Sequence, residues 1–519
     1  MVILPMGERA LLVELGTLDE VLALHRRLEA STPAGVAELV PAARTVLVVV
    51  DPKTLPLSAA RAWIERATGA AGRRDAEGPL VEMEITYDGP DLTSTAELFG
   101  IGPGELVRRH LAAPWRVAFT GFAPGFGYLV SDAWDFDVPR LDAPRTRVPS
   151  GAVGLAAGFT GAYPRETPGG WRLIGTTRAP LLTPSSSDPA LLTPGARVRF
   201  VTPDPGRAPA RPGAAIASPA PRAARPEGAL GTGIRVTEAG LLSTIQDLGR
   251  AGHAREGVAR SGALDRTALR TANRLVGNDE DAAGIEITLG GFRAVAERDL
   301  WFAVAGGWGP LRLGGRAVDP YEAVRWTAGA ELHVDWLAHG ARAYLAVRGG
   351  IAIEPVAGSR ASDLMAGLGH PPLRAGDALP IGVAARPIPT ADLAPWSPPG
   401  DAELEVELAA GPRADWFTAD ALRILYEQPW TVTNEADRVG MRLDGPELPR
   451  ARTGELPSEG MVPGALQVPP SGRPTILLAD GPVTGGYPVI AVVTDASLDA
   501  LAQARPGTRI RFRHAPPPH

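Results

Sequence analysis

The chain has 519 residues, of which 45% are apolar and 21% charged, and its formal net charge is −6. This composition is typical of soluble globular proteins, the length predicts about three or four domains, and the charge favours neither nucleic acid nor anionic lipid as a partner. Cysteine is absent, which excludes disulfides, thiolate nucleophiles and cysteine-based zinc sites.

Lysine is nearly absent as well, since Lys53 is the only lysine among the 52 basic residues. It follows a predicted strand and has no glycine-rich loop around it. A P-loop, a biotin carrier and a pyridoxal phosphate enzyme each need a lysine in a specific context. The sequence therefore argues against all three classes.

The sequence contains no pattern typical of a membrane or export segment. No apolar run reaches the roughly 18–20 residues of a membrane span, and the first residues lack the basic and then apolar pattern of a signal peptide. The eight histidines show no metal-ligand spacing. We therefore expect a cytoplasmic protein without a metal site that binds neither a membrane nor nucleic acid.

Residues 1–86 alternate between strand and helix patterns. Thr17 and Glu20 form a capping box that begins a helix extending to residue 30, and Ser58 caps a second helix extending to residue 66. Strands are expected at residues 10–15, 36–40, 45–50 and 80–87. The order β-α-β-β-α-β predicts a small ferredoxin-like α/β domain.

After residue 114, short apolar runs separated by Gly, Pro and Asn favour predominantly β structure. Helices are local, at residues 103–111 and 264–276, and Gly277 is placed to end the second one. Residues 205–230 consist mainly of Ala, Pro, Gly and Arg, which predicts an extended linker. The expected β domains therefore span residues 87–204, 231–400 and 401–519.

Three short blocks occur twice in the same order. Residues 148–151 (VPSG), 160–164 (TGAYP) and 194–200 (PGARVRF) return as residues 468–472 (VPPSG), 484–488 (TGGYP) and 506–512 (PGTRIRF). The last block is a turn followed by a strand with alternating faces, which suits the closing strand of a barrel. We infer that one β domain occurs at least twice.

Residues 120–129 (TGFAPGFGYL) follow a predicted strand and combine three glycines with aromatic side chains. In one interpretation this loop binds a planar ligand against bare backbone, with Phe122, Gly125 and Phe126 as the contacts. In the other it is a rigid turn whose aromatic side chains belong to the core. The pattern leaves both open.

Residues 145–177 combine arginines with hydroxyl groups and glycine-rich loops. Because arginine offers two-pronged hydrogen bonds to carboxylate or phosphate, this mixture suits a small anionic substrate. The candidate residues are Arg145, Ser150, Thr160, Tyr163 and Glu166. Solvated arginines on β-turns are the alternative.

Polar residues also crowd between apolar ones at residues 243–250 and 261–286 and, with the same character, at 434–442, 458–467 and 479–484. If buried, they need hydrogen-bond partners, which either a polar pocket or a helix-capping network could supply. The candidates in these segments are Gln246, Arg250, Asp265, Asn273, Arg442, Gln467 and Thr484.

Two sets of motifs resemble two subunits of one enzyme family. Residues 121–129, 148–153 and 160–171 resemble the B subunit of the prokaryotic ATP-dependent 5-oxoprolinase, also described as the allophanate hydrolase subunit 1 type. The second set resembles the C subunit of the same enzyme, the subunit 2 type, and comprises residues 243–250, 261–265, 272–278, 437–442 and 485–488. We call the two regions the B-like part (residues 1–204) and the C-like part (residues 231–519). The resemblance covers nearly the whole chain except the expected linker.

The resemblance implies a mainly β fold of tandem cyclophilin-like β-barrels, preceded by the small ferredoxin-like α/β domain. One barrel would lie in the B-like part and two in the C-like part. It implies hydrolysis of 5-oxoproline to glutamate, coupled to hydrolysis of ATP with Mg²⁺, without a bound prosthetic group. The activity requires the separate A subunit of the enzyme, and a homo-oligomer is left open.

The family reaction also suggests roles for motif residues. A lactam is a resonance-stabilised amide, and phosphorylating its carbonyl oxygen makes it an electrophile that water can attack. Cationic donors would stabilise the developing negative charge. We therefore expect catalytic roles for Arg145, Arg250 and Arg442, with Glu166 or Asp265 orienting water or a metal. The expected substrate- or nucleotide-binding residues are Phe122, Gly125, Phe126, Ser150, Thr160, Tyr163, Gln246, Asn273, Gln467, Thr484 and Tyr487.

Two other functions fit related domains. The same paired domains occur in urea amidolyase, so the chain could be a component of a biotin-dependent carboxyltransferase with a carrier supplied in trans. Relatives also resemble a sensor-kinase inhibitor and its antagonist, which suggests a regulatory binding protein. The fusion of the B-like and C-like parts in one chain favours the 5-oxoprolinase interpretation, because fusion fixes the stoichiometry of two enzyme subunits and raises their effective concentration.

Overall fold

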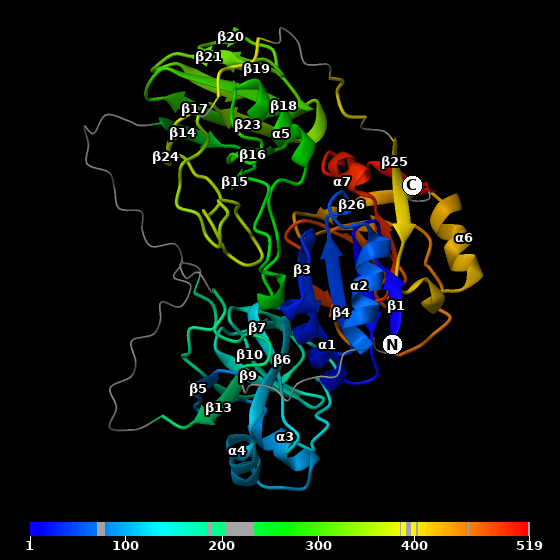
Figure 1. The fold of residues 1–519 in the computed structure, drawn as a ribbon. Coiled ribbons are helices and arrows are strands. Elements are labelled where there is room, and N and C mark those ends of the chain that lie inside the picture. The colour runs from blue at the N-terminus through cyan, green and yellow to red at the C-terminus, as the bar shows by residue number, and fades with distance from the viewer. Residues whose placement is uncertain are drawn as a thin grey trace.

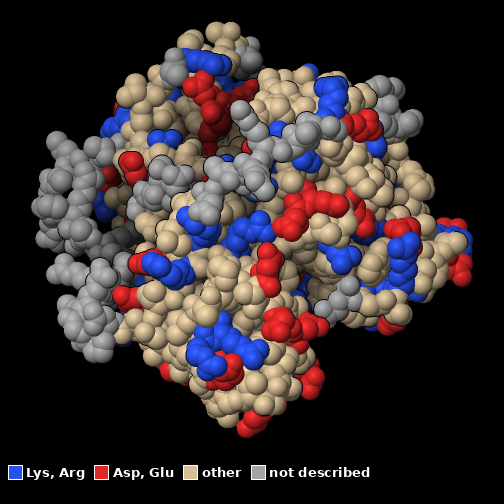
Figure 2. All heavy atoms as spheres, turned by 60° about the horizontal axis from the view of Figure 1, so that its bottom comes forward, with Lys and Arg blue, Asp and Glu red and all other residues tan. Residues whose placement is uncertain are grey.

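The computed structural model describes residues 1–69, 78–183, 189–203, 233–384, 386–390, 396–400, 403–454 and 456–516. The fold is mainly β, with barrels following a small α/β domain, as expected. The expected linker at residues 205–230 lies outside the described residues. Basic and acidic side chains are interspersed on the face shown in Figure 2, rather than gathered into one basic surface.

The N-terminal domain is a four-stranded antiparallel sheet with two helices. Its sheet order is β1-β2-β4-β3, and its elements are β1 (Val2–Pro5), β2 (Ala10–Glu14), α1 (Leu18–Ala30), β3 (Val36–Pro41), β4 (Thr45–Val50) and α2 (Leu57–Gly69). The capping box is confirmed: the Glu20 backbone N–H donates to Thr17 Oγ1 at 3.3 Å, and the Thr17 N–H donates back to Glu20 Oε2 at 3.3 Å.

One strand of this domain differs from the expectation. Residues 80–87 were expected to complete its sheet, but β5 (Leu80–Glu84) pairs in parallel with β13 (Arg197–Val201) in the next sheet. The edge beside β2 is occupied by β1 instead. The physical reason is proximity in the chain, since a short turn brings β1 against β2 at little cost in loop-closure entropy.

The next sheet forms the barrel of the B-like part, in the order β12-β9-β10-β7-β6-β13-β5. Between β5 and β13 its elements are α3 (Leu92–Leu98), α4 (Pro103–Ala112), β6 (Trp115–Gly121), β7 (Ala123–Val130), β8 (Arg145–Val148), β9 (Ala152–Ala156), β10 (Phe159–Ala162), β11 (Thr167–Gly169) and β12 (Arg172–Thr176). Residues 120–129 are therefore a tight β-hairpin rather than a loop, and Phe122 at its turn has φ +64°.

The middle unit consists of two sheets packed around one apolar core, in the orders β20-β19-β22-β17-β14-β24 and β15-β16-β23-β18-β21. Its elements are β14 (Gly233–Ala239), β15 (Leu242–Gln246), η1 (Ala254–Glu256), α5 (Arg266–Leu275), β16 (Gly284–Thr288), β17 (Phe292–Ala296), β18 (Leu300–Trp308), β19 (Leu311–Leu313), β20 (Arg316–Ala317), β21 (Val324–Trp326), β22 (Glu331–Val334), β23 (His339–Val347) and β24 (Ala378–Pro380). As expected, Gly277 follows α5 with φ +71°.

The C-terminal unit is a closed barrel in the order β25-β32-β29-β30-β27-β26-β33. Its elements are β25 (Glu403–Ala410), η2 (Ala414–Trp416), α6 (Ala419–Glu427), β26 (Trp430–Ala436), β27 (Gly440–Asp444), β28 (Glu459–Gly460), β29 (Ala465–Gln467), β30 (Thr475–Leu477), β31 (Thr484–Gly485), β32 (Val489–Val493), α7 (Asp495–Leu501) and β33 (Arg509–His514).

The first and last barrels repeat one arrangement, which agrees with the duplicated sequence blocks. The strand of each PGxRxRF block, β13 or β33, pairs in parallel with the first strand of its barrel, β5 or β25. A buried tryptophan begins the strand after the helix in each case. Trp115 Nε1 donates to the carbonyl oxygen of His110 at 2.9 Å, and Trp430 Nε1 donates to that of Leu425 at 3.1 Å.

The first barrel, the middle unit and the C-terminal barrel meet around the N-terminal domain (Figure 1). Alternate residues of its sheet face in opposite directions, so Val46 and Val48 pack under the helices while Leu12 and Leu47 pack against the C-terminal barrel. The segment after β15 extends away from the middle unit, and η1 packs on β3 and β6 (Figure 1).

Candidate functional site

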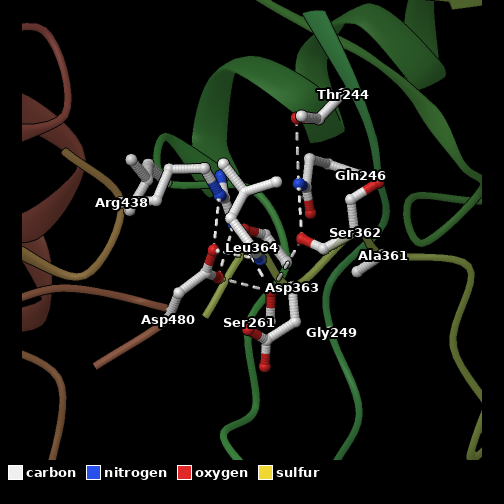
Figure 3. A network of polar contacts seen from close by, with 12 residues as sticks. Thr244, Gln246, Gly249, Ser261, Ala361, Ser362, Asp363, Leu364, Arg438 and Asp480 are labelled. Atoms are coloured by element: carbon white, nitrogen blue, oxygen red, sulfur yellow. Dashed lines mark hydrogen bonds and ion pairs between the residues drawn. The ribbon is translucent and has the colours of Figure 1, made fainter. Parts of the chain in front are cut away.

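A densely connected polar cluster lies where the middle unit meets the C-terminal barrel (Figure 3), and Arg438 is at its centre. Its side chain is 2% exposed. Nη1 donates to Glu286 Oε1 at 2.6 Å, while Nε and Nη2 donate to the two carboxylate oxygens of Asp480 at 3.0 and 2.9 Å. One guanidinium thus joins carboxylates from both units.

The turn that carries Arg438 explains its inward position. Asp437, at the start of the turn between β26 and β27, accepts the backbone N–H groups of Val439 and Gly440 at 2.8 and 2.9 Å. This local capping fixes the turn without using Arg438, whose side chain is free to enter the seam between the two units.

Ser261 contributes a hydroxyl group to the same cluster. Its Oγ donates to Asp480 Oδ1 at 2.6 Å and also lies 3.1 Å from the carbonyl oxygen of Ser362. Its backbone has φ +56°, a left-handed conformation that is costly for a residue with a side chain. Such strain persists only where surrounding contacts enforce it, and it is enriched at functional sites.

Glu286 is a buried carboxylate that remains charged. It accepts hydrogen bonds from the Tyr344 hydroxyl at 2.7 Å and from the Leu264 N–H at 3.1 Å. Burial alone would raise its pKa, but the guanidinium groups of Arg438 and Arg342 outweigh burial and hold the pKa below its usual value.

A second layer behind Ser362 holds three buried side chains with unused hydrogen-bonding atoms. Gln246 Nε2 donates to Ser362 O at 3.0 Å, but Gln246 Oε1 has no partner among the described residues. The same holds for Arg250 Nε and Nη1 and for Asp363 Oδ2, and Nη1 and Oδ2 are 3.9 Å apart. That distance is too long for a hydrogen bond, and a water or ligand group could bridge it.

Burial shifts the pKa values of charged groups in this layer and beside it. Burial and the neighbouring Asp480 raise the pKa of Asp363 to about 6, and burial lowers the pKa of Arg250. Asp265, the N-cap of α5, has its pKa raised to about 6 by burial, although it accepts hydrogen bonds from Gln503 Nε2 at 2.7 Å and from the Ala268 N–H at 2.8 Å.

A small cavity of about 50 Å³ lies beside Ser261 between the two units. The middle unit contributes Leu248, Arg260, Ser261, Ala263, Leu264 and Arg266, and the C-terminal barrel contributes Pro463, Leu478, Ala479, Leu498 and Ala502. A more open groove of about 260 Å³ lies where the N-terminal domain meets residues 252–255. Two carboxylates that line the groove are already engaged: Glu29 binds Arg255 at 3.1 Å, and Glu38 binds the backbone N–H groups of Gly252 and Ala254.

The seam brings together three of the residues expected from the sequence, Gln246, Arg250 and Asp265. Asn273 lies farther along α5, where it donates to the carbonyl oxygens of Glu280 and Ala282 at 3.3 and 2.7 Å and accepts from Asn278 Nδ2 at 3.0 Å. The two predicted alternatives, a helix-capping network and a polar pocket, are therefore both represented among these residues. Asn273 belongs to a capping network, while Gln246 and Arg250 keep unused polar atoms.

The candidates of the B-like part lie in that part's own barrel. Arg145 pairs with Asp91 at 2.7 Å, and Glu166 pairs with Arg147 at 2.7 Å on the exposed surface. Ser150 Oγ donates to the carbonyl oxygen of Pro164 at 3.0 Å.

The aromatic and hydroxyl candidates of this barrel are mostly in its core. Phe126 and Tyr163 are each 1% exposed and their rings are in contact. Thr160 is fully buried and lies 2.9 Å from His110 Nε2. Phe122 is 37% exposed at the hairpin turn, near Gly125.

The candidates of the C-terminal barrel face different surroundings. Thr484 is buried against Gly121 of the first barrel, and its Oγ1 has no partner among the described residues. Gln467 Nε2 contacts Met461 Sδ at 3.3 Å, whereas Tyr487 is 48% exposed. Arg442 has a side chain that is 63% exposed and paired with Glu435.

Sequence reasoning did not single out Arg438, Asp480 or Ser261, although all three lie in segments noted as polar. The alternation of inward and outward residues along the strand could have indicated which of the two arginines in this motif is buried. Met441 and Leu443 are core residues, so Arg442 between them must face outward, and Arg438 is the other arginine of that motif.

Two further observations concern the described part of the chain. Its side chains include no cluster of three or more His, Asp or Glu residues that could hold a metal ion. No helix in the same residues is long and apolar enough to cross a membrane.

The comparisons with known proteins match the two halves separately. A family model described as carboxyltransferase domain, subdomain C and D, matches residues 1–192, and one described as carboxyltransferase domain, subdomain A and B, matches residues 256–514. The chain is 39% identical over 286 residues to the 5-oxoprolinase C subunit of Escherichia coli K12, covering 54% of this chain and 90% of that protein. It is 37% identical over 173 residues to the 5-oxoprolinase B subunit of Escherichia coli O157:H7, covering 32% of this chain and 78% of that protein.

Two further relatives extend this picture. Urea amidolyase of Lachancea kluyveri is 31% identical over 304 residues, which cover 53% of this chain but 16% of that protein. The crystal structure of TTHA0988 superimposes with a TM-score of 0.84 at 36% identity, covering 97% of this chain and 99% of that chain. The whole arrangement of parts therefore recurs in another solved protein.

Proposed function

Because the chain belongs to the carboxyltransferase-domain family and joins relatives of the 5-oxoprolinase B and C subunits in one polypeptide, we propose that it supplies both subunits of an ATP-dependent 5-oxoprolinase. It works with a separate A subunit in the cytoplasm to hydrolyse 5-oxo-L-proline to L-glutamate. The observation that supports this most is the close docking of the two parts, in which Thr484 of one contacts Gly121 of the other.

The reaction needs an activated lactam. Transfer of the terminal phosphoryl group of ATP to the lactam oxygen makes the ring carbon electrophilic. Water then adds to that carbon, the ring C–N bond breaks, the nitrogen takes a proton, and phosphate leaves. The products are glutamate, ADP and phosphate. Phosphoryl transfer and water addition both place negative charge on oxygen, which buried cationic donors stabilise better than water does.

Arg250 is the candidate donor whose surroundings fit this task best. Its Nε and Nη1 are buried and have no hydrogen-bond partner among the described residues, and the carboxyl group of Asp363, with a pKa of about 6, lies 3.9 Å from Nη1. An acceptor oxygen placed there would satisfy both nitrogens. Arg145, Arg442, Glu166 and Asp265 keep their predicted roles as proposals. Because Mg²⁺ prefers phosphate oxygens with one or two carboxylates, it would arrive with ATP rather than in a protein cage.

Reconstitution tests this function directly. The purified chain is mixed with the separate A subunit, Mg²⁺-ATP and 5-oxoproline, and glutamate and phosphate are measured. Glutamate should form only when both proteins are present, and Arg250→Gln should reduce its rate. Absence of glutamate from a mixture of folded proteins would contradict the proposal.

A carboxyltransferase component is the second candidate, because the family model carries that description and urea amidolyase is among the relatives. In that case the same chain should instead consume a carboxylated biotin carrier in the presence of urea. Binding to a sensor-kinase domain without turnover of either substrate would favour a regulator. The two assays, run on one preparation, separate the three functions.

A further inference from the structure

The cavity beside Ser261 has walls suited to a small ring. Leu248 and Leu264 from the middle unit face Leu478 and Leu498 from the C-terminal barrel, so the interior is largely apolar. Its volume is about 50 Å³. Since a water molecule needs roughly 10–15 Å³ on this scale, there is room for about four waters, which matches a five-membered ring but not a nucleotide.

Arginine side chains gather at one edge of the cavity. Arg266 is shared between Asp495 and Asp499, each at 3.5 Å, and Arg9 pairs with the same Asp495. Two carboxylates therefore serve these two arginines at this edge of the cavity.

Arg260 lines the same cavity with a side chain that is exposed to solvent, and it forms no ion pair among the described residues. Its only hydrogen bond among the described residues runs from Nε to the carbonyl oxygen of Leu248 at 3.2 Å. Three nearby charged groups are the arginines Arg9, Arg266 and Arg270, against one carboxylate, Glu38. Glu38 already accepts two backbone N–H groups of the loop at residues 252–254. Arg260 is therefore the arginine of this edge that a ligand carboxylate could reach and pair with.

The cavity wall connects a bound ligand with the buried cluster of the seam. Ser261 is part of the wall, and its hydroxyl group is bonded to Asp480, which is bonded in turn to Arg438 (Figure 3). Ser261 keeps its strained backbone only while both units hold it, because its N–H donates to Ala479 O at 3.1 Å. The cavity therefore exists only in the docked arrangement of the two units.

We infer that this cavity binds a small cyclic carboxylate, with the ring between the leucines and the carboxylate on Arg260. This inference rests on the proposed function in one respect, because it identifies the cyclic carboxylate as 5-oxoproline, whose five-membered ring and single carboxylate match the size of the apolar cavity and the exposed guanidinium at its edge. It goes beyond that function by placing substrate recognition between the two units of the C-like part and by naming Arg260 as a specificity-determining residue.

Binding to the purified full-length chain, without the A subunit or ATP, tests the inference by calorimetry. The probes are 5-oxoproline, 2-pyrrolidinone, which lacks the carboxylate, and cyclopentanecarboxylate, which lacks the lactam. The chain should bind both carboxylates, and 2-pyrrolidinone more weakly. Arg260→Gln should weaken binding of the two carboxylates about tenfold or more, because a charge-assisted hydrogen bond is lost, and should leave 2-pyrrolidinone unchanged.

Two further variants make the result specific to the cavity. Ala479→Val fills part of the space and should weaken all three probes, whereas Arg316→Gln removes an exposed arginine of β20 outside the cavity and should weaken none. Equal binding of 5-oxoproline to Arg260→Gln and wild type would overturn the inference, as would no binding of any probe to the wild-type chain.

The reconstituted enzyme separates failure of the inference from failure of the proposed function. With the A subunit present, Arg260→Gln should raise the KM for 5-oxoproline more than it lowers kcat. Glutamate release with an unchanged KM would reject the role of Arg260 while the proposed function stands. Glutamate release by neither wild type nor variant would reject the proposed function, and calorimetry would still decide whether the cavity binds cyclic carboxylates.

Discussion

The first barrel, which begins with β5, and the last, which begins with β25, are two copies of one unit that have been kept alike where they build structure. In both, a parallel pair of first and last strands flanks a buried tryptophan that caps the preceding helix. Trp115 also contacts Phe200, and Trp430 contacts Phe512. Each of these phenylalanines is the aromatic residue of its PGxRxRF block. The shared residues are those that a barrel needs for closure.

The copies differ where the repeated TGxYP block meets its surroundings. Thr160 is bonded to His110 and Tyr163 is buried, whereas Thr484 faces the other part with an unused Oγ1 and Tyr487 is 48% exposed. The second copy has therefore turned the same block outward. The difference teaches that duplication preserved the scaffold while contacts between units changed, and the candidate site lies at such a contact.

The strongest test of the shared scaffold replaces the tryptophans. Trp115→Ala and Trp430→Ala should each lower the free energy of unfolding by about 3–5 kcal/mol, because a large fully buried side chain and its hydrogen bond are lost. Trp336→Ala, at a position 59% exposed, is the control and should change little. Urea unfolding followed by circular dichroism measures all three, and a clear inequality between the two buried sites would break the comparison.

A second test uses a residue that only the last barrel has. Gln503, which aligns with Leu191 in the repeat, donates to Asp265, whose pKa is raised to about 6 by burial. Since this value exceeds the unfolded value of about 3.9, Asp265 favours the folded state below about pH 4, and this contribution, on the order of 2–3 kcal/mol, is lost as the pH rises through 6.

Unfolding measured from pH 4 to pH 7.5 should show this loss in the wild type and a clearly smaller loss in Asp265→Asn, which keeps the helix cap but does not titrate at this position. The remaining loss comes from Asp363, whose pKa is also raised to about 6. Gln503→Leu restores the residue of the first copy and removes a donor, so it should raise the pKa and move the loss to higher pH. A pH profile of Asp265→Asn that matches the wild type would contradict the assignment.

The third test compares the two threonines of the repeated block. Thr160→Val leaves His110 Nε2 without its partner in the core and should cost about 1–3 kcal/mol. Thr484→Val removes a hydroxyl that has no partner among the described residues, so the free energy of unfolding should stay constant or increase slightly. Equal losses from both substitutions would show that Thr484 has a partner such as an ordered water.

The smallest expected effect on stability is that of Arg442→Ala. Its side chain is exposed and forms one surface ion pair, so the free energy of unfolding should change by no more than about 0.5 kcal/mol. A loss of glutamate release in this variant would therefore come from the reaction or from binding, as its predicted role requires. An unchanged rate would remove Arg442 from the proposed machinery.

The features predictable from the sequence were those determined by neighbours in the chain. Thr17 and Glu20 cap a helix through contacts three residues apart, and the repeated blocks could be recognised without knowing their partners. Pairing of β5 with β13 was not predictable, because it joins strands of one barrel that lie more than one hundred residues apart in the sequence.

The same distinction applies to the site. Gln246, Arg250 and Asp265 stood out because polar residues crowd among apolar ones locally. Arg438 did not, since its partner Glu286 is 152 residues away and the motif offered Arg442 as an equally attractive arginine. Local alternation could have rejected Arg442 as a buried residue, but only the tertiary fold identifies the carboxylates that make Arg438 essential to the seam.

The contact between Gly121 and Thr484 makes the sequences of the two parts dependent on each other. A Cβ at position 121 would overlap Thr484 Oγ1 and lie within 3 Å of Thr484 Cβ and Cγ2. Even alanine at position 121 would therefore force the two parts to separate. Thr484→Gly removes all three obstructing atoms and should rescue Gly121→Ala. The two positions therefore depend on each other. The B-like or the C-like part can be exchanged for a homologous one only if the replacement carries a matching residue at position 121 or 484.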